Sequence, residues 1–136
     1  EDVIIIYDRG IMDNKAYIPD NEFDTLLDYL SREIGVNIDE QDILSRYDMV
    51  IHLVTSAGKR GYSLESNKAR YESESIAISL DKKTMAAWEK HNNLNVVAST
   101  DNFEDKINSV LDIINNFLNE GKCVKRGNRL CRIKKQ

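Results

Sequence analysis

The sequence has little proline, little cysteine and no long apolar run. Its single proline, Pro19, together with the lack of repeats, argues against a proline-rich or low-complexity chain. Cys123 and Cys131 have a C-x7-C spacing with no nearby histidine, which fits neither a disulfide framework nor a zinc signature and favours a reducing compartment. No apolar run approaches the roughly 20 residues of a membrane helix, and nothing resembles a signal peptide. We therefore expect a globular, cytoplasmic domain without a transmembrane segment.

Two catalytic motifs are also missing. The sequence contains no G-x-x-x-x-G-K-[ST] phosphate loop. The segment from Ser56 to Arg60 has a Gly-Lys pair but lacks the first glycine, the following hydroxyl and the change from strand to helix. No Gly-x-Ser-x-Gly elbow surrounds any serine, so serine hydrolysis is unsupported. No motif specific for nucleic acid is present either.

Charge is distributed unevenly along the chain. The net charge is -4, but residues 122–136 hold seven of the 19 basic residues and no acid. The remaining 12 basic residues are set against 23 acidic ones, so residues 1–121 carry about -11 and the tail carries +7. This asymmetry predicts a domain at 1–121 and a basic tail at 122–136, which either binds anionic lipid, nucleic acid or the acidic body of the chain itself, or is simply solvated.

Apolar segments alternate between strand and helix character. Residues 3–7 are a continuous apolar run, typical of a strand buried on both faces of a parallel sheet. Residues 49–54 are predicted as a second buried strand, and residues 94–98 as a third, shorter one. Helices are predicted from Asp20 or Asn21 to Gly35, from Asp39 to Tyr47, over 67–90, and from Asp101 or Asn102 to Gly121. This alternation predicts an α/β fold with a parallel sheet of about three strands. Because the first strand opens the sequence, we expect the later part of a longer domain.

Two groups of residues are candidates for chemistry. Asp8 ends the first predicted strand, where a carboxylate can hold magnesium, and Arg9 beside it can pair with phosphate oxygens. Arg60 lies in a basic, glycine-bearing loop, and Asn67 and Arg70 lie at the start of the long helix, where anions are favoured. The alternatives are that Asp8 caps a loop and that the basic loop is a solvated surface.

The remaining distinctive side chains predict a core. His52 and His91 are expected to be hydrogen-bonded core residues rather than ligands or bases, because each is isolated in the sequence. Trp88 and Met85 are expected in the core rather than on a binding platform.

Four stretches resemble one family in order and spacing. They are Tyr7-Asp8-Arg9-Gly10-Ile11-Met12-Asp13-Asn14-Lys15-Ala16-Tyr17, then residues 47–55, 64–72 and 80–88, with residues 103–107 completing the pattern. Together they are similar to the AAA-like P-loop NTPase domain of TRPL translocation defect proteins, with its nucleotide-kinase-like sheet. The resemblance covers about residues 3–118 and implies an incomplete three-layer α/β sheet that lacks the Walker A loop.

The resemblance also implies a function. It implies Mg²⁺-dependent hydrolysis of ATP or GTP, or phosphoryl transfer, in the intact protein, and an inactive fragment here. Asp8 would be the Walker B acid and metal ligand, and Arg9 its catalytic neighbour. Arg60 and Arg70 would close over the nucleotide, with Asn67 beside them, and Ser99 and Thr100 would lie near the base. The alternative is a non-catalytic interaction module whose basic tail binds anionic lipid or an acidic partner.

Overall fold

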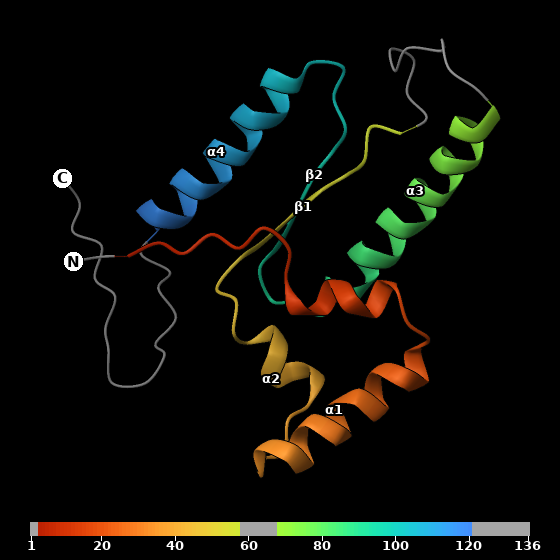
Figure 1. Ribbon diagram of the computed structural model, residues 1–136. Coiled ribbons are helices and arrows are strands. Elements are labelled where there is room, and N and C mark those ends of the chain that lie inside the picture. Colours follow the sequence, from red (N-terminus) through yellow and green to blue (C-terminus); the bar gives the residue numbers. More distant parts are fainter. Residues whose placement is uncertain (1–2, 58–67, 121–136) are drawn as a thin grey trace.

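A computed structural model describes residues 3–57 and 68–120, with side chains described from residue 74 in the second range. The described elements follow one another as η1 (Ile11–Ala16), α1 (Asp20–Ile34), α2 (Glu40–Leu44), β1 (Val50–Leu53), α3 (Lys68–Trp88), β2 (Leu94–Val97) and α4 (Phe103–Asn119). In Figure 1 the two strands run between α3 and α4, while η1, α1 and α2 gather at one end of the molecule.

The sheet of the described residues is parallel and two-stranded. β1 pairs with β2 from Val50↔Leu94 to Leu53↔Val97, and α3 connects the two strands in sequence. A parallel pair needs such a crossover connection, because its strands run in the same direction. The strands predicted at 49–54 and 94–98 are therefore confirmed in their positions.

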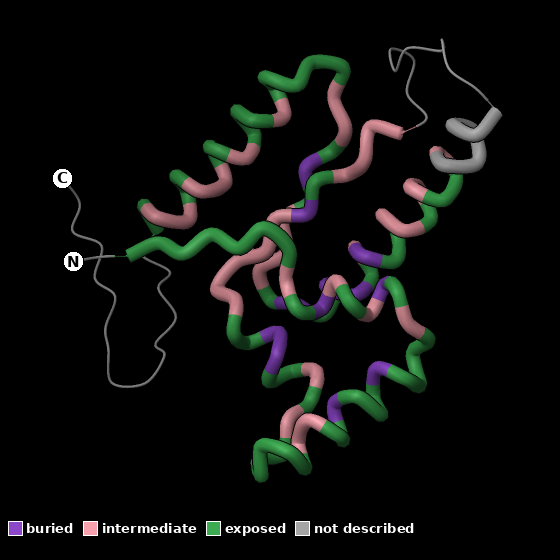
Figure 2. Tube along the Cα trace, in the orientation of Figure 1, coloured by how far each residue is buried: buried purple, intermediate pink, exposed green. Residues whose placement is uncertain are grey.

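Residues 3–7 are the main departure from the sequence prediction. They form no strand, and the exposed fractions of Val3 to Tyr7 range from 59% to 78% (Figure 2). The expectation of a strand buried on both faces is wrong for this structure. The physical reason is that no strand of the described residues pairs with this segment, so neither its backbone nor its apolar side chains are covered.

Local sequence signals explain the helix boundaries. α1 ends at Gly35, whose φ of 74° is a left-handed conformation that glycine adopts without steric cost. The side chain of Asp39 accepts from Asp42 N, and that of Asp42 accepts from Asp39 N, which gives α2 a capping box. α4 begins after Asn102, whose side chain accepts from Glu104 N. α1 instead begins after Pro19, without the side-chain cap expected from Asp20 or Asn21.

The core lies beside the sheet rather than across it. Met12 of η1, Phe23 of α1, Leu44 of α2 and Trp88 of α3 are all at most 4% exposed and belong to one cluster. Figure 2 shows the buried segments concentrated in these elements. By contrast, α4 has no buried residue, and Phe103 is 74% exposed. Ile107 and Leu111, four and eight residues after Phe103, are 43% and 50% exposed, so this apolar side of α4 is only partly covered by the described residues.

Candidate functional site

The turn after residues 3–7 has an unusual backbone. Arg9 has a φ of 78°, in the left-handed region that costs a residue with a Cβ roughly 1–2 kcal/mol. Its side chain is 70% exposed, and Nη1 lies 3.4 Å from Asp13 Oδ2. Asp8 is exposed as well. Strained backbone of this kind often accompanies functional positions, and it falls here on one of the residues that the sequence singled out.

Gly10 allows this turn to lie against the core. A Cβ added at Gly10 would be 2.3 Å from Trp88 Cζ2 and 2.6 Å from Cη2. The indole is itself fixed, since Nε1 donates a 2.6 Å hydrogen bond to Asp13 Oδ1. Trp88 is 4% exposed, which confirms the prediction that it belongs to the core. Glycine is therefore required at position 10 for contact with the core.

Tyr47 holds the turn from the other side. Its hydroxyl accepts a 2.9 Å hydrogen bond from Ile11 N. Its ring meets Tyr7 edge-on at a centroid distance of 5.9 Å and Trp88 edge-on at 5.0 Å. Three aromatic rings thus join the segment before the turn, the segment before β1 and the end of α3.

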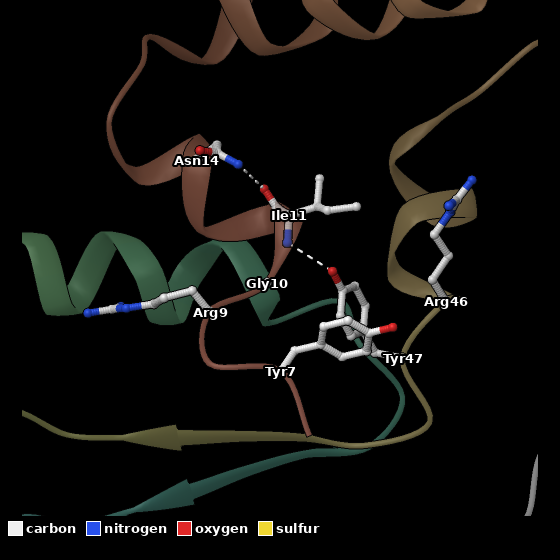
Figure 3. Close-up of a pocket in the computed structure, with 7 residues that line it drawn as sticks. All are labelled: Tyr7, Arg9, Gly10, Ile11, Asn14, Arg46 and Tyr47. Atoms are coloured by element: carbon white, nitrogen blue, oxygen red, sulfur yellow. Dashed lines mark hydrogen bonds between the residues drawn. The ribbon is translucent and has the colours of Figure 1, made fainter. Parts of the chain in front are cut away.

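A pocket of about 430 Å³ opens at this turn. The residues that line it are Tyr7, Arg9, Gly10, Ile11, Asn14, Arg46 and Tyr47. In Figure 3 the two tyrosine rings lie together, and the arginine side chains extend on opposite sides of them. Asp8 is not among the lining residues. The sequence singled out Arg9 as a site residue but not Tyr7, Arg46 or Tyr47. The two tyrosines stand in stretches quoted for the family resemblance, whereas nothing in the sequence pointed to Arg46.

Ser99 and Thr100 lie at the other end of the sheet. Ser99 Oγ donates to Ser56 Oγ at 3.2 Å, so the residues that follow the two parallel strands meet. The hydroxyl of Thr100 donates to Asn102 O at 2.6 Å, within the turn before α4. Lys106 Nζ donates to Val54 O at 2.6 Å, which brings a cation from α4 to the same edge. Hydroxyl groups and a cation thus share the carboxyl edge, where open α/β sheets bind ligands.

Both histidines are buried, as predicted, and His91 is hydrogen-bonded, whereas Nε2 of His52 has no hydrogen-bond partner among the described residues. His91 is 9% exposed and its Nε2 lies 2.7 Å from Tyr47 O. His52 is 8% exposed, and its Nε2 lies 3.3 Å from Asp81 Oδ1, within ion-pair distance but without hydrogen-bond alignment. Asp81 Oδ1 also accepts from Thr55 N, so one carboxylate of α3 joins the end of β1.

The predicted site residues therefore do not all meet. Arg9 lies near Tyr47, before β1, whereas Ser99 lies beside Ser56, after β1. Arg60, Asn67 and the basic tail lie outside the described residues, and Arg70 belongs to α3 without a described side chain.

Among residues 3–57 and 68–120, no three acidic, histidine or cysteine side chains are grouped as metal ligands. In the same ranges, no helix has the length and apolar character to cross a membrane.

Comparison of the chain with protein-family models, with curated protein sequences and with solved structures gives no match.

Proposed function

We propose that the chain forms part of an AAA-like P-loop NTPase domain of α/β type, which hydrolyses ATP or GTP or transfers its terminal phosphoryl group. Support comes from the parallel β1–β2 pair with α3 between the strands in sequence, the arrangement that builds such sheets. Further support comes from the hydroxyls of Ser56 and Ser99 at the carboxyl edge. A nucleotide at that edge would occupy the usual ligand position of an open parallel sheet.

One observation carries the proposal: residues 3–7 are apolar and 59–78% exposed, and no strand among the described residues pairs with them. In the family that the sequence resembles, the strand that bears the phosphate loop lies between the strands corresponding to residues 3–7 and to β1. We infer that a strand of a longer polypeptide pairs with both segments and carries the glycine-rich loop. Such pairing would cover apolar surface worth about 25 cal/mol per Å².

Individual residues receive roles within this proposal. Asp8 offers a single carboxylate. One carboxylate is enough for a magnesium ion that takes its other ligands from water and phosphates. When bound, magnesium neutralises charge on the phosphates. Arg9 would pair with phosphate oxygens, and Arg60 and Arg70 would close over them. Asn67, which precedes α3 in the sequence, would lie near them. Ser99 and Thr100 would border the base.

Isothermal titration tests this proposal. Most backbone N–H groups that cradle phosphates belong to the phosphate loop, so the 136-residue chain should bind MgATP and MgGTP weakly or not at all. The polypeptide extended by its upstream coding sequence should bind one of them at least a hundredfold more tightly. Asp8→Asn in the extended polypeptide should weaken magnesium-dependent binding of the nucleotide. Asp24→Asn, at an exposed position of α1, should leave that binding unchanged.

Two results would contradict the proposal. One is tight, magnesium-dependent binding of ATP or GTP by the 136 residues alone. The other is an upstream sequence without a glycine-rich loop followed by lysine and serine or threonine. The proposal places the protein in the cytoplasm.

A second candidate function rests on charge alone. The tail at 122–136 carries +7 against about -11 in the rest of the chain, so it could bind anionic lipid or an acidic partner. Vesicles with phosphatidylserine should bind the full chain in a salt-sensitive manner and should not bind a 1–121 variant. Equal binding of the two chains would exclude a role of the tail in lipid binding.

A further inference from the structure

We propose that the pocket between Tyr7 and Arg46 binds a small anion that carries a planar ring, of the nucleoside monophosphate class. This site goes beyond the proposed NTPase function, because it needs neither a phosphate loop nor magnesium. It is built from residues of the turn after Tyr7 and of the segment before β1. The volume of about 430 Å³ lies within the range of small-molecule sites, which is about 300–1,000 Å³.

The tyrosines provide a surface for a ring. Tyr47 is fixed by the hydrogen bond from Ile11 N and by its edge contact with the buried Trp88. Tyr7 packs edge-on against Tyr47 and remains 65% exposed. A face of Tyr7 is therefore available, and a base stacked on an aromatic ring gains about 1–3 kcal/mol.

Arg46 provides the charge. Its side chain is exposed, and it forms no ion pair with the residues that the structure describes. The lining contains no carboxylate, although the whole chain has a net charge of -4. Arg9, by contrast, is engaged with Asp13 and extends on the far side of the tyrosines (Figure 3). We therefore assign the phosphate to Arg46, whose guanidinium can donate two parallel hydrogen bonds to it.

Ligand titration of the 136-residue chain, by calorimetry and by two-dimensional NMR, tests the site. AMP or GMP should bind with a Kd in about the millimolar range or below. Adenosine, which lacks the phosphate, and ribose 5-phosphate, which lacks the base, should each bind at least tenfold more weakly. Inorganic phosphate shows whether the pocket is only a general anion site. It should also bind at least tenfold more weakly than AMP or GMP.

Variants separate the two parts of the site. Arg46→Gln should weaken AMP binding at least tenfold, and Arg46→Lys should restore part of it because the charge is kept. Tyr7→Ala should weaken binding, while Tyr7→Phe should keep it, because only the ring is needed. Arg32→Gln is the matched control, because Arg32 is an exposed residue of α1 and does not line the pocket. Far-ultraviolet circular dichroism establishes that each variant is folded.

The proposal is overturned if folded Arg46→Gln and Tyr7→Ala bind AMP and GMP as tightly as the unchanged chain. It is equally overturned if phosphate alone binds as tightly as the monophosphates, or if neither monophosphate binds. The monophosphate site is tested on the 136-residue chain and the NTPase proposal on the extended polypeptide, so the failure of one is distinguishable from the failure of the other.

Discussion

Replacing Gly10 by alanine tests how closely the turn approaches the core. The backbone at Gly10 has φ -117° and ψ 167°, an extended conformation that alanine adopts freely. Any cost of the substitution must therefore come from the added methyl group. That methyl would lie 2.3 Å and 2.6 Å from two carbons of Trp88, well below contact distance.

The magnitude follows from what would have to move. The indole donates to Asp13 and packs edge-on against Tyr47 and against His91, at centroid distances of 5.0 Å and 6.3 Å. Overpacking at such a site costs about 1–3 kcal/mol. If the indole shifts and its hydrogen bond is lost, a further ~1 kcal/mol is added. We expect Gly10→Ala to lower the free energy of unfolding by about 2–4 kcal/mol.

Urea denaturation followed by fluorescence measures this change. Trp88 is the only tryptophan, so its emission reports directly on the contact. Trp88→Phe provides the control background, because phenylalanine lacks the outer ring that the new methyl meets; there the unfolding is followed by circular dichroism. Gly10→Ala should cost less than about 1 kcal/mol in that background. An equal cost in both backgrounds would refute the steric argument.

Two further substitutions test local features. Arg9→Gly should raise the free energy of unfolding by about 0.5–1 kcal/mol, because relief of the left-handed strain exceeds the loss of an exposed ion pair. Arg9→Ala keeps a Cβ and should give no such gain in urea denaturation; equal stability of the two variants would contradict the strain. Asp39→Ala should lower stability by about 1 kcal/mol through loss of the capping box, whereas Asp39→Ser should keep most of it, as thermal unfolding would show. No difference between these two variants would contradict the role of the cap.

Much of the local structure could be predicted from the sequence. Asp39, Asn102 and Gly35 mark helix ends through interactions within a few residues, so their roles do not depend on distant contacts. The strands at 50–53 and 94–97 fall within segments that the sequence predicts as strands, and they pair with each other. Trp88 and His91 were correctly expected to be buried.

The failures concern longer-range contacts. Periodicity identifies residues 3–7 as apolar and extended, but burial requires a neighbouring strand that periodicity alone does not supply. Arg46 was missed because its place beside Tyr7 depends on how α2 and the turn pack, not on any motif. The strain at Arg9 was also unforeseeable, since arginine rarely adopts a positive φ.

The proposed sheet of the longer polypeptide requires a different position for the turn after residue 7 than the one that the structure shows. Tyr7 contacts Tyr47, before β1, whereas Ser99 contacts Ser56, after β1. The four residues of β1 alone span about 10 Å at roughly 3.3 Å per residue. For Asp8 to face a nucleotide at the carboxyl edge, residues 3–7 must run beside an added strand, which would carry the turn toward Ser99.

Spin labels can measure that movement. Labels at Tyr7→Cys and Asp101→Cys, with Cys123 and Cys131 replaced by serine, report the separation of the turn from the carboxyl edge by pulsed electron resonance. The distance should be shorter in the polypeptide extended upstream than in the 136-residue chain, because the added strand directs the turn to that edge. Labels at Glu33→Cys and Asp101→Cys serve as the control for a general rearrangement. The same Tyr7–Asp101 distance in both polypeptides would mean that Asp8 stays away from the carboxyl edge, and its assignment to a magnesium-nucleotide site would then be wrong.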